Sequence, residues 1–313
     1  MKQFLKNVVL PRLPFLVKGY FPTSICIEPT NRCNLKCVGC PRRNMTRSHG
    51  DLSFEDFQYI IDQIPTLKRV SLFFMGEPLL NPDIWRMVRY AEDKAIRTLI
   101  ATNSELVGHA LESIFESGLS QINFSLDGMS QATIETYRVH SSFKRVFNGI
   151  NAVLRDKKNQ GAAKPHVKIR FLVLRQNEHE IPLLTKFASE NNVELSLVRA
   201  ILDYGLESLP EAVAKEWLPL NPRYQRYTKD GNIKQPAKYC SWIWTPLVTW
   251  DGDVIPCCID TDAMIKLGNV FEEPFNMIYW SRRYMDVRRR MMRKTLPICR
   301  LCKETEKSQI VIT

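Results

Sequence analysis

Runs of β-favouring residues alternate about six times with helically spaced apolar residues in the first two thirds of the chain. The expected strands are residues 24–28, 69–74, 96–101, 121–126, 167–174 and 193–198, and the expected helices are residues 53–64, 82–93, 105–117, 131–157 and 178–191. This alternation is typical of an α/β fold with a parallel sheet. No Gly-x-Gly-x-x-Gly turn follows any expected strand, which disfavours a dinucleotide-binding Rossmann sheet. The prediction is a partial (β/α)6 barrel, similar to a TIM barrel, over residues 21–200.

The pattern changes after residue 200. Prolines punctuate a polar stretch over residues 201–238, which is interpreted as a linker with one short helix at residues 211–217. Further on, Asp251-Gly252 lies between two β-favouring runs and predicts a β-hairpin, and helical spacing resumes over residues 276–293. We therefore expect residues 239–313 to form a small C-terminal domain of a β-hairpin and a helix.

Basic residues outnumber acidic residues by 44 to 33, which gives this chain of 313 residues a formal net charge of +11. Such an excess favours contact with anions. No aromatic and basic recognition module is apparent, so nucleic acid is not expected as a partner. The arginines of the 276–293 helix are interpreted as a solvated face.

Residues 1–20 combine basic and apolar side chains but lack the continuous apolar core of a signal peptide. They are expected to form an N-terminal arm that packs across its own domain, and peripheral contact with a membrane surface is the alternative. No apolar run approaches the roughly 18–20 residues of a spanning helix. The absence of a leader, together with the clustered cysteines, indicates a cytoplasmic protein, with membrane association as the alternative.

Three cysteines follow the first expected strand at the spacing Cys-x3-Cys-x2-Cys: Cys33, Cys37 and Cys40. Iron–sulfur cubes normally have four cysteine ligands, so a loop that offers three indicates an iron left open for a small ligand. A zinc site is the alternative, but through residue 50 the only near partner is His49. Disulfides are disfavoured, because nine cysteines is an odd number and no secretory leader precedes them.

Other unusual turns follow the next three expected strands: Gly76-Glu77-Pro78, Thr102-Asn103 and the segment from Ser125 to Gly128. Taken singly, each turn is explained by the preference of turns and helix caps for these residue types. In barrels of parallel strands, however, the chemistry gathers at the carboxyl ends of the strands. The common position of these turns therefore predicts one site that they share with the cysteine loop.

The cysteine spacing resembles the signature of the radical S-adenosylmethionine (SAM) enzymes. The resemblance implies a [4Fe-4S] cluster that binds SAM and cleaves it to a 5′-deoxyadenosyl radical, which removes a hydrogen atom from substrate. The turn at residues 75–78 resembles the family's Gly-Gly-Glu turn, with Met75 in place of the first glycine, and residues 102–104 resemble a Thr-Asn-Gly turn that ends in Ser104. The implied SAM contacts are Gly76, Glu77, Thr102, Asn103, Ser125, Asp127 and Arg170, with Arg175 as the alternative to Arg170 for the SAM carboxylate.

A second set of cysteines lies in the C-terminal region: Cys240, the adjacent Cys257 and Cys258, and the Cys-x2-Cys pair Cys299 and Cys302. The pattern of Cys240 followed by Gly252-x4-Cys257 resembles the SPASM extension of radical SAM enzymes in its shorter, twitch form. The resemblance implies one auxiliary [4Fe-4S] cluster. Its implied ligands are Cys240, Cys257, Cys299 and Cys302, with Cys258 as the alternative to Cys257. A zinc ribbon with the same cysteines is the other interpretation.

The resemblance, together with the second cysteine set, implies a radical SAM oxidoreductase. A closed second cluster can accept an electron from a substrate radical, which favours net oxidation by dehydrogenation or bond formation. The expected substrate is a small polar or anionic metabolite. A low-potential donor such as flavodoxin or ferredoxin is the expected protein partner. A maturase acting on a peptide or protein is the alternative, and a non-catalytic iron–sulfur or zinc interaction protein is the third interpretation. Glu77, Asp127 and His140 are candidate catalytic bases by residue type alone.

Overall fold

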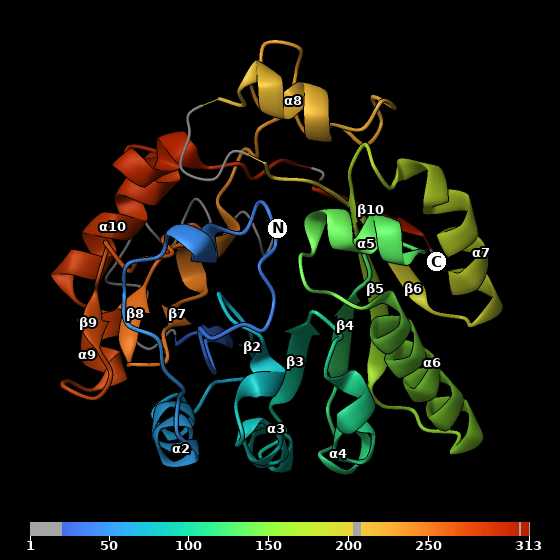
Figure 1. Cartoon of the computed structure of the whole chain (residues 1–313). Helices are drawn as coiled ribbons and strands as arrows, with labels where there is room; N and C mark the ends of the chain where they lie inside the picture. Colours follow the sequence, from blue (N-terminus) through green and yellow to red (C-terminus); the bar gives the residue numbers. More distant parts are fainter. Residues whose placement is uncertain (1–20, 203–207, 307, 313) are drawn as a thin grey trace.

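The computed structural model describes residues 21–202, 208–306 and 308–312, so the arm predicted at residues 1–20 lies outside the described residues. Within these ranges ten strands form one sheet, in the order β10-β6-β5-β4-β3-β2-β1-β7-β8-β9. The two edge strands are not paired with each other in the described chain, so the sheet is an open, curved wall (Figure 1). The predicted α/β partial barrel is confirmed.

Six parallel strands make the centre of the sheet. They are β1 (Ser24–Ile27), β2 (Arg69–Leu72), β3 (Arg97–Thr102), β4 (Gln121–Ser125), β5 (His166–Val173) and β6 (Glu194–Arg199). Along β3 and β5 buried residues alternate with more exposed ones, because successive side chains point to opposite faces of a strand. The predicted strands over residues 21–200 are confirmed to within two residues at either end.

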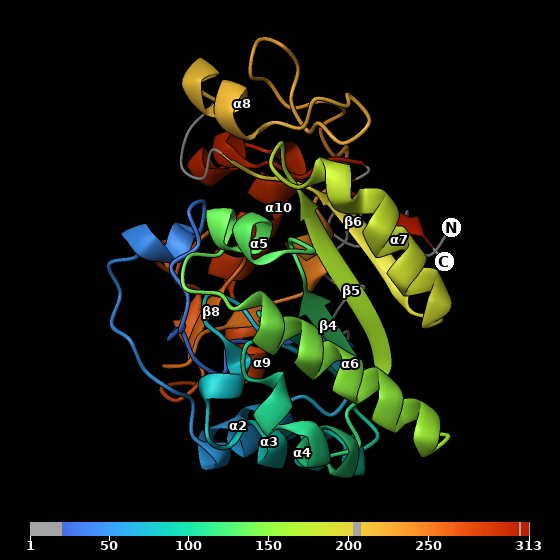
Figure 2. The same cartoon turned by 45° about the vertical axis from the view of Figure 1, so that its right-hand side comes forward.

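Helices follow one another along the outer face of this sheet (Figure 2). They are α2 (Phe54–Asp62), α3 (Ile84–Asp93), α4 (Leu111–Glu116), α6 (Phe143–Asn159) and α7 (Ile181–Glu190). Their apolar faces, such as Phe57 of α2 and Ile150 of α6, are fully buried in one core with the strands. The helices thereby cover one face of the sheet and leave the loops at the strand ends uncovered.

The predicted continuous helices over residues 131–157 and 276–293 are wrong, because each is two helices with a serine between them. Helix α5 (Gln131–Tyr137) precedes α6, and α9 (Phe275–Tyr279) precedes α10 (Arg282–Arg293). Ser142 and Ser281 accept hydrogen bonds from the backbone of the second helix of each pair, as N-cap residues do. The first break allows residues 138–141 to approach the cysteine loop.

The C-terminal region extends the same sheet at both edges. At one edge β7 (Leu247–Val248) pairs in parallel with β1, and β8 (Asp253–Ile255) and β9 (Gly268–Asn269) continue from it. The hairpin predicted at Asp251-Gly252 is confirmed between β7 and β8, where Gly252 has a φ of 88°. At the other edge β10 (Gln309–Ile312) pairs antiparallel with β6.

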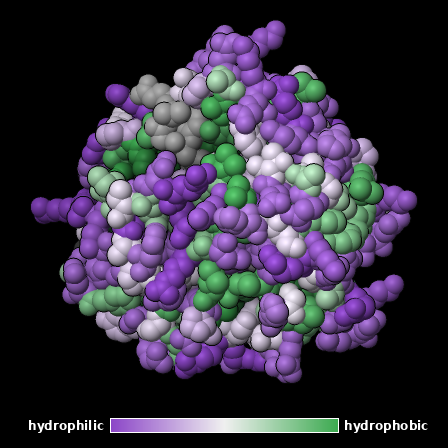
Figure 3. Space-filling view, viewed as in Figure 1, coloured by the Kyte–Doolittle hydropathy of each residue, from purple (hydrophilic) through white to green (hydrophobic). Residues whose placement is uncertain are grey.

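The short helix predicted in the linker is confirmed as α8 (Glu211–Trp217), which lies at the top of the molecule in Figure 1. Hydrophilic side chains cover most of the face in Figure 3, with smaller apolar patches between them. In the described part of the chain no helix is both long and apolar enough to span a bilayer.

Candidate functional site

The cysteine loop that follows β1 is closed by its own return segment. Thr30 and Asp51 form an isolated antiparallel bridge, and Thr30 Oγ1 donates to Asp51 Oδ1 at 2.6 Å. The Asn31 side chain donates to Ser48 O at 2.7 Å and accepts from Gly50 N at 3.0 Å. Between these contacts the loop carries three partly exposed cysteines, each with a free thiol: Cys33, Cys37 and Cys40.

The thiols of this loop are close enough to influence one another. Burial raises the pKa of Cys33, and it raises the pKa of Cys37 to about 11. The charge of Cys40 contributes to both increases. A metal cluster binds thiolates and displaces these protons. Three neighbouring sulfurs on one loop fit three of the four ligand positions of an iron–sulfur cube.

Glu77 joins the predicted strand-end turns to the cysteine loop. Its carboxylate accepts hydrogen bonds from Thr102 Oγ1 at 2.7 Å and from Asn103 N at 2.6 Å. Its own N–H donates to Arg32 O at 2.8 Å. The Asn103 side chain in turn lies 3.9 Å from the Cys33 sulfur. The structure therefore brings together the loops that follow β1, β2 and β3.

Asp127 connects β4 to β5 and to the end of α5. Its carboxylate accepts from Arg138 Nε and from Leu172 N, both at 2.6 Å. The Arg138 charge opposes the burial that raises the pKa of Cys37, so Arg138 lies beside the cysteine loop. Sequence reasoning misses Arg138, because a residue inside an expected helix gives no sign of facing a distant carboxylate.

The three candidate bases differ in exposure. Glu77 and Asp127 are 2% and 1% exposed, and both carboxylates already accept the hydrogen bonds given above. Burial raises the pKa of Glu77, and the donors from Asn103 and Thr102 oppose that shift. His140 is exposed in the segment after α5, at a left-handed φ of 76°. Glu77 and Asp127 therefore hold neighbouring backbone and side-chain groups in place, and their part in catalysis stays a prediction.

The remaining predicted SAM contacts lie on β4 and β5. Ser125 and Arg170 are partners in the register of these strands, and Arg170 is half-buried. Arg175 is exposed, and its Nε donates to Leu218 O at 3.1 Å beside α8. Of the two arginines, Arg170 is therefore the one that lies within the sheet beside Ser125.

The second cysteine set gathers near the β7–β8 hairpin. Burial, together with the charges of Cys257, Cys302 and Cys299, raises the pKa of Cys240 to about 12. These thiols, though far apart in sequence, are thus neighbours. No group of three or more Cys, His, Asp or Glu side chains in the described ranges has the arrangement of a single-ion site. The ligands of a four-iron cluster lie farther apart than the ligands of a single ion, because the whole cluster lies between them.

The adjacent Cys257 and Cys258 have different protonation preferences. A hydrogen bond from the Cys258 thiol lowers the pKa of Cys257 and raises that of Cys258. The two thiols therefore hydrogen-bond to each other, and Cys257, which the Gly252-x4-Cys257 spacing indicates, stays the predicted ligand with Cys258 as its alternative.

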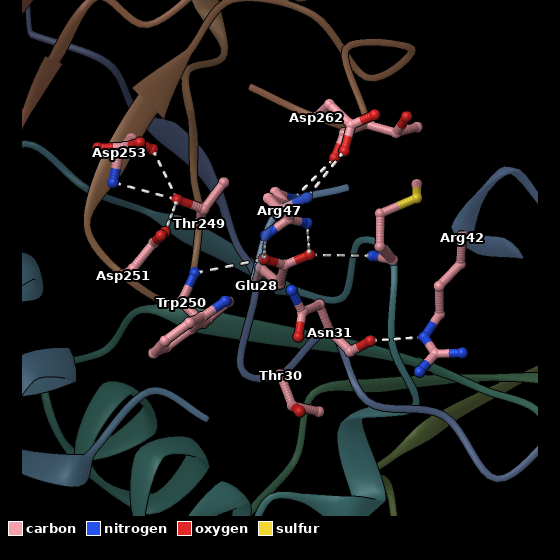
Figure 4. Close-up of polar contacts among 12 residues, drawn as sticks. Glu28, Thr30, Asn31, Arg42, Arg47, Thr249, Trp250, Asp251, Asp253 and Asp262 are labelled. Atoms are coloured by element: carbon pink, nitrogen blue, oxygen red, sulfur yellow. Dashed lines mark hydrogen bonds and ion pairs between the residues drawn. The ribbon is translucent and has the colours of Figure 1, made fainter. Parts of the chain in front are cut away.

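A buried ion pair joins the segments that carry the two cysteine sets (Figure 4). Glu28 is fully buried and accepts from Arg47 Nη2 at 2.5 Å and from Arg47 Nη1 at 2.7 Å. The same carboxylate accepts from Met75 N and from Trp250 N, each at 3.3 Å. Glu28 therefore holds the end of β1, the return segment of the cysteine loop, the turn after β2 and the β7–β8 hairpin.

The auxiliary region also bonds directly to the return segment of the cysteine loop (Figure 4). Asp262 Oδ1 accepts from Thr46 N at 2.6 Å and from Arg47 N at 3.2 Å. Arg47 Nε donates to Thr261 O at 2.7 Å. No local sequence pattern predicts these contacts, because Arg47 and Asp262 are 215 residues apart.

Two family models match the chain. The radical SAM superfamily model matches residues 27–188, and the model of the iron–sulfur cluster-binding domain SPASM matches residues 240–303. The chain belongs to the radical SAM superfamily, and it is a radical SAM enzyme with a C-terminal SPASM domain. Its cofactors are SAM, a [4Fe-4S] cluster that binds SAM and an auxiliary iron–sulfur cluster, as predicted.

Proteins similar in sequence have names that describe different activities. The tungsten-containing aldehyde ferredoxin oxidoreductase cofactor-modifying protein of Pyrococcus furiosus is 25% identical over 247 residues, which cover 74% of this chain and 69% of that protein. A probable GTP 3′,8-cyclase of Methanothermobacter thermautotrophicus is 25% identical over 276 residues, 80% of this chain and 88% of that protein. In structure, Streptococcus suis SuiB bound to its precursor peptide SuiA has a TM-score of 0.64 at 17% identity, and the match covers 92% of this chain and 72% of SuiB. This last likeness is one of fold.

Proposed function

We propose that this enzyme oxidises a small polar or anionic metabolite, with Cys33, Cys37 and Cys40 holding the cluster that binds SAM. When bound, the cluster and SAM supply a 5′-deoxyadenosyl radical that removes a hydrogen atom from the substrate. One further electron and one proton must then leave the substrate before a stable oxidised product is formed. The chain has to position SAM, admit the substrate and provide an acceptor for that electron.

The strand-end residues position SAM in this proposal. Gly76 lets the turn after β2 lie against the backbone carbonyls of Thr30 and Arg32. Glu77 orients the Thr102-Asn103 turn through its two acceptor oxygens. Asp127 orients Arg138 beside Cys37, while Ser125 and Arg170 extend the surface along β4 and β5.

The position of the second cysteine set carries the oxidative assignment. Four of its five thiols, Cys240, Cys257, Cys299 and Cys302, are expected to serve one cluster, which leaves the first cluster an iron open for SAM. A groove of about 660 Å³ is lined by Pro41 of the cysteine loop and by Ile259 and Ile298 of the C-terminal region. These residues adjoin Cys40, Cys258 and Cys299. An auxiliary cluster held by Cys240, Cys257, Cys299 and Cys302 at this groove can accept the second electron.

The size of the groove and the charge of the chain support a small anionic substrate. Small-molecule sites enclose about 300–1,000 Å³, a range that includes this groove. The net charge of +11 favours an anion, and the GTP cyclase relative bears the name of a nucleotide substrate. Modification of a peptide is the second candidate, supported by the fold likeness to SuiB, which was solved with its precursor peptide.

Anaerobic reconstitution followed by iron, sulfide and zinc analysis tests the cluster assignment. Two four-iron clusters correspond to about eight irons per chain. Addition of SAM and a low-potential reductant, supplied chemically or by flavodoxin or ferredoxin, should then release 5′-deoxyadenosine. Bound zinc without SAM cleavage would overturn the proposal. Pools of deuterated metabolites and of deuterated peptides distinguish the two substrate classes, because the true substrate transfers deuterium into 5′-deoxyadenosine.

Cysteine variants test the site of the SAM-binding cluster and the site of the auxiliary cluster independently. Replacing Cys33, Cys37 and Cys40 together with Ala should abolish SAM cleavage. A variant carrying Cys299→Ala and Cys302→Ala should still cleave SAM but leave the substrate oxidation incomplete. Cys26→Ala is the matched control, because Cys26 is a core residue, 2% exposed in β1, and its loss should spare both clusters.

A further inference from the structure

Arg288 is fully buried, unlike the other arginines of α10. The prediction of a solvated basic face describes Arg282, Arg283, Arg289, Arg290 and Arg293, which are exposed, but it is wrong for Arg288. The exposed arginines follow the outer side of the helix, whereas Arg288 lies four residues after the buried Tyr284 on the inner side. A buried guanidinium therefore has to be explained.

The partners of Arg288 are aromatic rings and neutral groups. Its Cζ lies 3.7, 4.0 and 4.9 Å from the ring centroids of Tyr284, Tyr279 and Trp244. Its Nε donates to Ile243 O at 3.2 Å, and its Nη1 donates to Tyr279 O at 2.8 Å. Among the described residues it has no carboxylate partner, and its Nη2 is buried without a hydrogen-bond partner. Cation–π contacts offset only part of the cost of burying a charge.

This unbalanced cation lies beside the segment that begins at Cys240. The 3-10 helix Ser241–Trp244 follows Cys240 directly and supplies Ile243 O. The Tyr284 hydroxyl is likewise buried without a hydrogen-bond partner in the described chain. Burial raises the pKa of Tyr284, the Arg288 side chain lowers it, and negative charge on Cys240 would raise it, so Tyr284 lies near both Arg288 and Cys240. Two buried donor groups, Arg288 Nη2 and the Tyr284 hydroxyl, thus lie near an expected cluster ligand.

We propose that Arg288 is the counter-ion of the auxiliary cluster and that the Tyr284 hydroxyl donates a hydrogen bond to a sulfur at that cluster. The inference rests on the proposed function, which makes Cys240 a ligand. A cluster held by four thiolates is an anion, and one-electron reduction adds a further negative charge. A buried cation and a hydrogen-bond donor stabilise the reduced form, because charge and hydrogen bonds to the sulfurs set the potential. The pair makes the cluster a better electron acceptor.

A redox titration tests this role without any substrate. The full chain with Cys33→Ala, Cys37→Ala and Cys40→Ala retains only the auxiliary cluster, whose midpoint potential is measured anaerobically by EPR of the reduced form. In this background Tyr284→Phe and Arg288→Gln should each lower the potential. A tenfold loss in the one-electron equilibrium is a fall of about 59 mV. Arg288→Lys keeps the charge and should restore most of the potential lost in Arg288→Gln.

Tyr279→Phe is the control, because it removes a hydroxyl from another ring around Arg288 and should leave the potential unchanged. If the cluster loads and its potential is the same in the parent, in Tyr284→Phe and in Arg288→Gln, this inference is overturned while the proposed function stands. If Arg288→Gln does not load, the Tyr284→Phe result decides. A parent variant that binds no auxiliary cluster overturns both this inference and the proposed ligands.

Discussion

Gly76 is the point at which the turn after β2 comes closest to the cysteine loop. A Cβ added there would lie 2.3 Å from Thr30 O and 2.6 Å from Arg32 O, and both are backbone atoms. Gly76→Ala should therefore displace the cysteine loop. Overpacking of this kind costs about 1–3 kcal/mol, and about 1.4 kcal/mol is tenfold in affinity. We expect the SAM dissociation constant, measured on reconstituted protein, to rise about tenfold.

Gly108→Ala is the matched control for this prediction. A Cβ at Gly108 would meet nothing within 4 Å, so the SAM dissociation constant should stay at the parental value. Equal dissociation constants for the parent, Gly76→Ala and Gly108→Ala would show that the close approach at Gly76 does not shape the SAM surface.

The buried Glu28–Arg47 pair makes a prediction about stability. Arg47→Ala leaves the fully buried Glu28 carboxylate without its cation, which should lower the free energy of unfolding by about 3–5 kcal/mol. Urea denaturation measures the change. The double variant with Glu28→Gln should lose less than Arg47→Ala alone, because the uncompensated charge is gone. Lys215→Ala, in an exposed pair with Glu211, should change stability by no more than about 1 kcal/mol. Similar losses in Lys215→Ala and Arg47→Ala would contradict the role of burial.

At the level of single elements, α10 depends on its cap. The Ser281 side chain accepts from Tyr284 N, which satisfies one of the free donors of the first turn. Ser281→Ala should destabilise the protein by about 1 kcal/mol, within a range of about 0.5–2 kcal/mol. The thermal midpoint should fall accordingly. Ser189→Ala removes an exposed serine within α7, away from any N-cap, and a fall of the same size there would argue against the cap.

The strands and their order along the barrel could be predicted because each is a short run of β-favouring residues between turn residues. The helix breaks before Ser142 and Ser281 could not, since the apolar spacing continues across them and a mid-helix serine resembles a cap only in the folded chain. The pairings of β7 with β1 and of β10 with β6 are non-local, and no local sequence pattern in either segment predicts them.

The candidate site likewise contains residues that could be predicted from the sequence and residues that could not. The cysteines, Gly76 and Glu77 could be found because strand ends and metal-ligand spacings are local patterns. Arg138 and Arg47 could not, because their importance comes from carboxylates on other elements, Asp127 and Glu28. What sequence reasoning lacks here is the set of contacts that hold the predicted loops against one another.

For the molecule as a whole, the continuous sheet implies that the SPASM region supports the barrel as well as the second cluster. A chain ending at residue 238 loses β7 and exposes the edge of β1, in which Ile25 and Ile27 are fully buried. An uncovered apolar edge strand is an aggregation site. We expect this truncation to aggregate in size-exclusion chromatography with light scattering. Removing residues 308–313 takes away β10 and uncovers only the edge of β6, so this variant should aggregate less than the truncation that uncovers β1 and β6 together. Equal, parental profiles for both would refute the supporting role.

Both cysteine sites partly bury their thiols, which makes cluster loading a pH-dependent property of the whole molecule. Burial raises the pKa of Cys37 to about 11 and that of Cys240 to about 12, so both are protonated near neutral pH. Loading must release these protons, and below such a pKa the thiolate fraction rises about tenfold per pH unit. The initial rate of iron incorporation should therefore increase steeply between about pH 7 and about pH 9, with protons released as absorbance grows. A flat rate would mean that the thiolates form before iron arrives.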